Sequence, residues 1–293
     1  MSMLKNTSIQ LNTNQQTAKI MKRFDEIDFL KGIGAILVIL GHMQYTDQLK
    51  NLATFIYGFH MPLFFWISGN LYKKPALFGE YVIKKAKSIL IPYCFFGLLY
   101  CFFSFIIEGR EAGLKGLVGV CFKVVRDIPI EIGLWFLPVL FLVSCLFAFI
   151  DLDLTNTFIK NSVITIISIT GFIIVKQFHY LPFGISSALP CIAFFATGYY
   201  FNQYIDFVKK VLVEEHRCLL FVISLLIIFG VLIMSNGKIS VRMGNYGFSL
   251  LAYISSMVYS FCFLILSLLI CSDSGDLRRY TNFKSTILFF IAS

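Results

Sequence analysis

The sequence is poor in charge. Only 14% of its 293 residues are Asp, Glu, Lys or Arg, whereas a soluble globular domain averages about 25%. Hydrophobic residues make up 58%, 33 residues are Phe, and the mean hydropathy is +0.79. This composition excludes an ordinary soluble enzyme. It indicates an integral membrane protein whose spans are helices of about 20 residues.

Several other signatures are missing. None of the eight cysteines forms a C-x-x-C pair and most lie in apolar runs, so they are interpreted as small buried hydrophobes, with a catalytic Cys as the alternative. There is no visible internal repeat, which disfavours a transporter built from two related halves. The first residues lack the apolar core of a signal peptide, and we expect 1–22 to form a flexible cytosolic tail.

Long apolar segments dominate the remaining sequence. They predict an all-α fold, a polytopic transmembrane helical bundle with about eight full spans and a partial ninth that begins near Thr286. The eight expected spans are 28–45, 51–72, 89–107, 134–150, 161–176, 186–204, 217–234 and 247–271.

The basic residues lie between these segments. The net charge of +9 therefore indicates membrane topology, and no nucleic-acid partner is expected. With the N-terminus inside, the inner segments carry roughly twice as many Lys and Arg residues as the outer ones, so we expect a cytosolic N-terminus.

The first apolar segment contains three ionisable residues, Asp28, Lys31 and His42. Such groups cost roughly 2.5–3.5 kcal/mol each in hydrocarbon, so they usually face a protein interior or a water-filled path. Lys31 and His42 are 11 positions apart, which places them on one face of a helix. Asp28 and Lys31 form an i, i+3 pair of opposite charge. The segment therefore predicts one polar stripe, charged at its cytosolic end.

The second segment contains His60, nine residues after its expected start at Asn51. Pro62 follows and removes a backbone hydrogen bond, so a kink is expected beside the imidazole. Because the first span runs outward and the second returns, His42 and His60 are expected to share a pocket in the outer half of the membrane. Ser68 lies eight residues further along the second span.

Histidine can move a proton near neutral pH, and a buried imidazole can deprotonate a hydroxyl for acyl transfer. The alternative, left open for His42 and His60, is that each only hydrogen-bonds a neighbouring helix. No metal site is expected, because two histidines without a nearby carboxylate are a weak ligand set.

Two softer signals lie outside the stripe. Trp135 opens the fourth segment in GLWFLPVLF, as either a membrane-interface aromatic or a site residue. The loop at 73–88, KKPALFGEYVIKKAKS, is strongly basic. Topology and anionic membrane lipid explain it, or it receives an anionic donor that carries phosphate.

These motifs resemble the membrane acyltransferase 3 family of bacterial O-acyltransferases. Its first span has an Ile-Asp pair, then a basic residue, and a His after ten intervening positions. The residues of this sequence that match are Ile27, Asp28, Lys31 and His42. One branch is similar to the O-acetyltransferase of enterobacterial common antigen, and its second span reads FHMPLFF followed by SG. The matching residues are 59–65, Ser68 and Gly69.

The resemblance implies a membrane acyltransferase domain at 23–293 in a bacterial inner membrane. It implies no bound cofactor, an acyl-CoA co-substrate, usually acetyl-CoA, and an acceptor hydroxyl on a cell-envelope glycan or lipid-linked sugar. Many members have Arg where this chain has Lys31, which keeps the charge but loses the bidentate fork. The family commonly closes with another His, where this sequence has Ser293. A catalytically silent homologue is therefore one alternative.

The resulting prediction is an O-acyltransferase with His42 as general base. His60 would orient the acceptor hydroxyl or shuttle its proton, while Lys31 would pair with Asp28 and attract the donor. The rival class is a transporter or exporter of a glycan or small anion that uses the polar stripe as its path.

Ser68 and Trp135 complete the predicted site as supporting or donor-binding residues. Direct acyl transfer is expected, because no covalent nucleophile stands out, with an acyl-enzyme on Ser68 as the alternative.

Overall fold

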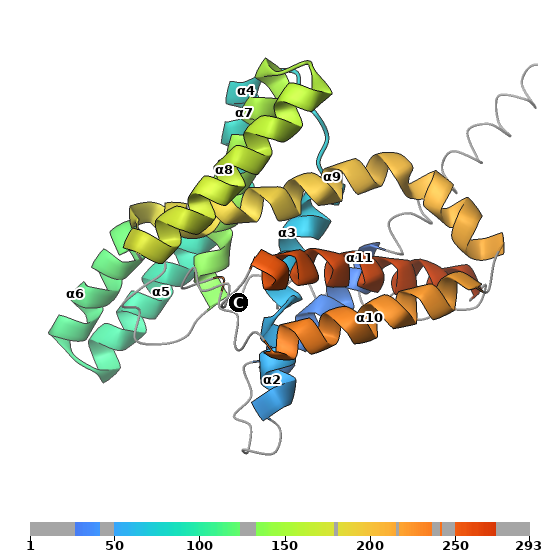
Figure 1. Cartoon of the computed structure of the whole chain (residues 1–293). Coiled ribbons are helices and arrows are strands. Elements are labelled where there is room, and N and C mark those ends of the chain that lie inside the picture. Colours follow the sequence, from blue (N-terminus) through green and yellow to red (C-terminus); the bar gives the residue numbers. More distant parts are fainter. Residues whose placement is uncertain are drawn as a thin grey trace, which may run out of the picture.

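The computed structural model describes residues 27–41, 50–123, 133–178, 181–214, 217–235, 241 and 250–273. Across these residues the regular elements are helices, and none of them is a strand (Figure 1). The all-α fold class predicted from the sequence is therefore confirmed.

A first helix covers residues 27–41. The later α-helices are α2 (Lys50–Tyr57), α3 (His60–Asn70), α4 (Phe78–Lys85), α5 (Ile91–Ile107), α6 (Arg110–Val118), α7 (Phe136–Asp153), α8 (Thr157–Phe178), α9 (Ile185–Glu214), α10 (Arg217–Ser235) and α11 (Leu250–Asp273). Short helical turns join some of them: η2 (Ala86–Leu90), η3 (Gly119–Lys123), η4 (Gly133–Trp135) and η5 (Pro182–Gly184).

Five helical stretches in the described part of the chain are long and apolar enough to cross a membrane. They are Asn51–Asn70, Phe78–Ile107, Phe136–Asp153, Thr157–Val175 and Pro182–Tyr204. Shorter apolar helices occupy Val222–Met234 and Tyr253–Ser267, where the sequence predicted two further spans. The expected count of about eight full spans is not confirmed: five helices in the described part of the chain are long enough, and the described parts of the other apolar helices are shorter.

Two helices extend beyond the spans expected from hydropathy. The expected span 89–107 belongs to a continuous run from Phe78 to Ile107, and α9 continues past residue 204 to Glu214. The hydrogen-bonded backbone of each helix continues beyond the apolar run, because the i to i+4 bonds of a helix do not depend on hydropathy. Pro92 is tolerated because it lies in the first turn of α5, directly after the π-helical turn η2.

The tightest packing joins α3 to α9, which passes beside it in Figure 1. Glycines allow the two backbones to touch: a Cβ on Gly69 would overlap the carbonyl of Phe195, and one on Gly198 would overlap the carbonyl of Trp66. Small residues at helix crossings are the usual means of close approach in membrane proteins. The crossing fixes α3, which carries His60, against the rest of the helices.

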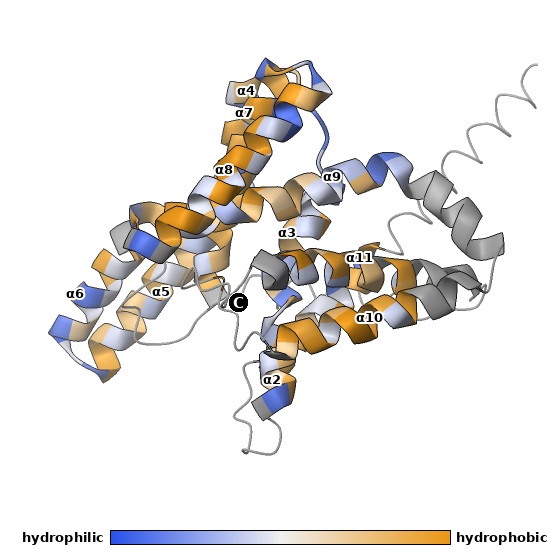
Figure 2. Ribbon diagram, viewed as in Figure 1, coloured by the Kyte–Doolittle hydropathy of each residue, from blue (hydrophilic) through white to orange (hydrophobic). Residues whose placement is uncertain are grey.

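Many large hydrophobic side chains are exposed, and α5, α8 and α10 consist largely of hydrophobic residues (Figure 2). The predicted burial of cysteines is confirmed for Cys101, Cys191 and Cys262 but is wrong for Cys94 and Cys121, which are exposed. Lipid-facing and buried residues are both apolar in a membrane protein, so an apolar run in the sequence does not distinguish them.

Candidate active site

The first helix runs antiparallel to α2 and α3. A Cβ on Gly34 would lie 2.9 Å from Cζ of Phe64, and one on Gly41 would lie 3.3 Å from Cγ2 of Ile56. Later residues of the first helix therefore meet earlier residues of the second span. This is the antiparallel pair of helices that the sequence predicts.

Asp28 and Lys31 form the ion pair expected from their spacing. Lys31 Nζ lies 3.1 Å from Asp28 Oδ1, and the two side chains are 30% and 36% exposed. Leu30, between them, is buried in one cluster with Trp66 of α3. The pair thus lies beside the later turns of α3, whereas His60 is its first residue.

His60 is buried, with an exposure of 1%. Its Nδ1 lies 2.8 Å from the carbonyl oxygen of Ile56. A carbonyl can only accept, so this contact requires a proton on Nδ1. The Tyr57 ring packs edge-on against the imidazole with centroids 5.1 Å apart. The hydrogen bond and the ring contact together fix the orientation of the buried imidazole.

The second span is interrupted immediately before His60, between α2 and α3. Phe59 has φ −142° and ψ −17°, outside the helical region. Pro62 lies in the first turn of α3, where its ring leaves the Gly58 carbonyl without the N–H donor of a continuous helix. The predicted kink beside the imidazole is therefore present, and it falls at Gly58–Phe59 because that is where the hydrogen bond is lost.

His42 lies outside the described residues. Its neighbour Gly41 is the last described residue of the first helix. A Cβ on Gly41 would lie 3.3 Å from Cγ2 of Ile56 and 3.7 Å from Cε2 of Tyr57. These two residues belong to the helical turn that precedes His60. A shared pocket for His42 and His60 stays a prediction, which this packing favours.

Ser68 belongs to α3 and Trp135 lies near it, and their side chains make different contacts. The Ser68 hydroxyl donates to the Phe64 carbonyl at 2.8 Å, a bond within its own helix. Trp135, in η4, is buried and packs edge-on against Phe136, whose ring lies 5.0 Å from that of Phe65. The Trp135 ring thus packs in the apolar core next to α3, and the Ser68 hydroxyl donates its proton to a backbone carbonyl of its own helix.

A buried polar cluster that the sequence did not predict lies near the ends of α3 and α7 and the start of α8. Lys160 Nζ lies 2.5 Å from Asp151 Oδ1, and the exposures of the two residues are 7% and 0%. The Tyr72 hydroxyl donates to Asp151 Oδ2 at 3.2 Å, and Lys74 Nζ donates to the Asp151 carbonyl at 2.6 Å. Lys160 was interpreted as a topology charge in a loop, although an Asp and a Lys flanking one short turn could have signalled a pair.

Tyr72 lies just beyond the apolar stretch Asn51–Asn70. Burial, together with the Asp151 carboxylate beside it, raises the pKa of the Tyr72 phenol above its usual range. The hydroxyl therefore stays protonated and acts as a donor, which ties the end of α3 to the α7–α8 turn.

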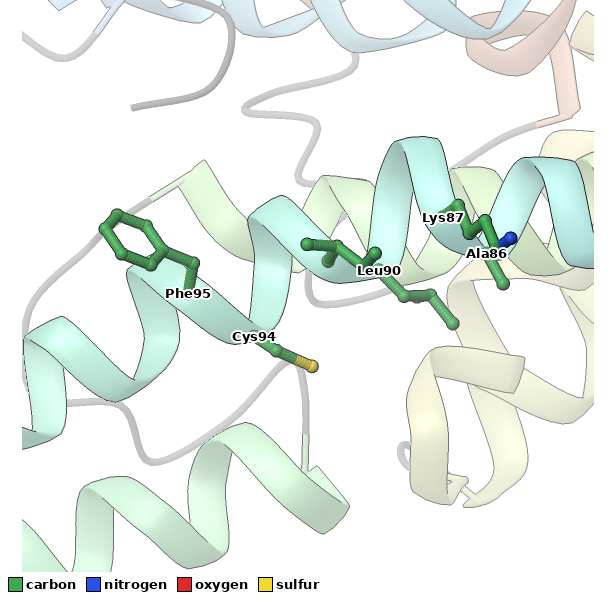
Figure 3. Close-up of a pocket in the computed structure, with 6 residues that line it drawn as sticks. Ala86, Lys87, Leu90, Cys94 and Phe95 are labelled. Carbon is green, nitrogen blue, oxygen red and sulfur yellow. The ribbon is translucent and has the colours of Figure 1, made fainter.

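Four exposed lysines follow α3 in the chain and are called the basic surface below: Lys73, Lys74, Lys84 and Lys87. Beside them lies an apolar depression of about 460 Å³ whose six lining residues all come from η2 and α5. Figure 3 shows Lys87 towards one end of it and Phe95 at the other. The ammonium groups of the basic surface can pair with the phosphates of an anionic ligand. Within the described residues, no three His, Cys, Asp or Glu side chains gather closely enough to hold a metal ion.

Comparisons with known proteins indicate the family of this chain. A family model described as an acyltransferase domain matches residues 24–293. Nodulation protein NolL from Sinorhizobium fredii (strain NBRC 101917 / NGR234) is 39% identical over 104 residues, which is 30% of this chain and 28% of that protein. The chain thus aligns with less than a third of that relative's length. No solved structure matches the chain. Because the family model covers nearly the whole sequence, the chain belongs to the acyltransferase 3 family.

Proposed function

We propose that the protein is an integral membrane O-acyltransferase that moves an acyl group, most simply acetyl, from acyl-CoA to a hydroxyl. The acceptor is a cell-envelope glycan or a lipid-linked sugar, and the setting is a bacterial inner membrane with the N-terminus in the cytosol. The observation that supports this most is the family match over 24–293. Apolar helices with two buried or half-buried ionisable sites on adjacent spans agree with it.

The chemistry assigned to the chain is general-base catalysis. His42 takes the proton of the acceptor hydroxyl while the oxygen attacks the thioester carbonyl, and the CoA thiolate leaves and takes up a proton. His60 orients the acceptor or relays that proton through Nε2, the ring nitrogen that is not bonded to Ile56. Such catalysis typically contributes about 10²–10⁴-fold. No covalent intermediate is assigned, because the Ser68 hydroxyl is bonded to its own helix.

Donor binding is assigned to the basic surface and to the Asp28–Lys31 pair. The exposed Lys84 and Lys87 offer positive charge to the phosphates of CoA, next to an apolar surface. Lys31 is half-exposed beside Asp28, so it retains a face that can attract an anion. A lysine acts there as a point charge and not as a bidentate clamp.

The direct test is a mass spectrum of envelope glycans from cells with and without the protein. The proposal predicts glycan species heavier by one acyl group only when the protein is present, and the mass difference identifies the acyl group. A matched strain with the Lys31→Met protein should show less of the modified species. Identical spectra in all strains, with the protein present in the membrane, would contradict the proposal.

A further inference from the structure

The break between α2 and α3 exposes a backbone carbonyl inside the protein. In a continuous helix the N–H of residue 62 would donate to the Gly58 carbonyl, but Pro62 has no N–H. A buried carbonyl without a donor costs free energy comparable to a lost hydrogen bond. The break therefore needs a donor from another part of the chain.

Helix α11 supplies that donor. The Ser256 hydroxyl donates to the Gly58 carbonyl, and Ser256 is 1% exposed. On another side of the break, α10 presses Ile233 against Gly58 so closely that a Cβ there would overlap it. The Phe59 ring stacks on Phe263 of α11 with centroids 4.9 Å apart. The break is thus held from outside by α10 and α11.

His60 spans this break with its side chain. Its Cα begins α3, while its Nδ1 bonds to the carbonyl of Ile56 in α2. The direction of Nε2 therefore depends on the relative orientation of α2 and α3. A hydrogen bond that fixes the Gly58 carbonyl between them also fixes that orientation.

We propose that Ser256 is a positioning residue for His60, acting through the Gly58 carbonyl that Pro62 leaves without a helical donor. The proposal rests on the proposed function only in that His60 takes part in acyl transfer. The contact itself can be tested without activity.

The first experiment observes the imidazole directly. Protein labelled with ¹⁵N-histidine contains four histidines, and His60→Gln identifies the His60 ring signals. Ser256→Ala is expected to shift the His60 Nδ1 and Nε2 signals. The matched control is Ser260→Ala on the same helix, whose buried hydroxyl donates to the Ser256 carbonyl; it should leave those signals in place. Unchanged signals in Ser256→Ala, or equal shifts in both variants, would overturn the proposal.

A second variant tests the role of Pro62. Pro62→Ala restores an N–H that can donate to Gly58, so Ser256→Ala should matter little in that background. The double variant is expected to return the His60 signals towards their position in Pro62→Ala alone. If Ser256→Ala does not fold, Pro62→Ala/Ser256→Ala should restore folding. Additive effects, or a double variant no better than Ser256→Ala, would contradict the proposal.

Activity provides a third readout. Misplacing a catalytic group by about 1 Å can cost up to about a hundredfold in rate, so Ser256→Ala is expected to lower kcat about tenfold. The KM for acyl-CoA should change less than about twofold, because Ser256 is buried between helices and offers no surface to the donor. A tenfold rise in that KM with kcat unchanged would overturn the positioning role. If the wild-type protein transfers no acyl group while the His60 signals still respond, the proposed function fails and the positioning stands.

Discussion

Replacing Lys160 by methionine should destabilise the protein strongly. Asp151 is fully buried and Lys160 nearly so, with their charged atoms 2.5 Å apart. Removing one partner of a buried pair leaves an uncompensated charge and typically costs about 3–5 kcal/mol. Tyr72 still donates to Asp151 Oδ2 in this variant, so the loss is expected near the lower end, about 3 kcal/mol.

Thermal unfolding of the purified protein in detergent measures this loss. Lys115→Met is the control, because Lys115 is exposed on α6 and a surface charge contributes about 0–1 kcal/mol. The double variant Asp151→Asn/Lys160→Met removes both charges and should recover much of the stability. A Lys160→Met protein that unfolds at the same temperature as Lys115→Met would refute the reasoning.

Three further outcomes are expected. Lys31→Met should raise the KM for acyl-CoA, while Lys31→Arg keeps most of the function. Equal KM values in the two variants would show that the charge of Lys31 does not contribute to donor binding. Gly198→Leu should sharply reduce folded protein in the membrane, because its Cβ meets the Trp66 carbonyl and overpacking alone costs about 1–3 kcal/mol; wild-type levels would contradict the close crossing. Reporter fusions at Lys85 and Lys115 should lie on opposite sides of the membrane, and signals from the same side would overturn the expected topology.

Spacing along one helix was enough to predict part of the site. The i, i+3 interval of Asp28 and Lys31 predicted their ion pair, and the missing N–H of Pro62 predicted a disturbance beside His60. Both follow from local backbone geometry, which a sequence carries directly. The antiparallel pairing of the first two spans followed equally from their alternating direction across the membrane.

Contacts between distant segments could not be obtained in that way. Asp151 and Lys160 both fell in the connection between the expected spans 134–150 and 161–176, and no periodicity indicates that a loop charge is buried. Ser256 looks like any serine in an apolar helix, because its partner Gly58 lies 198 positions away. The span boundaries were also missed where α4 and α9 continue, since hydropathy reports where lipid ends and not where a helix ends.

The most direct test of the central claim is acyl transfer by the purified protein in lipid, followed as CoA release from acetyl-CoA with and without an acceptor glycan. The account predicts release that requires the acceptor and falls by about 10²–10⁴-fold in His42→Gln, the range that general acid–base catalysis contributes. His42→Gln should remain folded and inserted. A His42→Gln protein with near wild-type turnover, or a wild-type protein that moves glycan without releasing CoA, would contradict it.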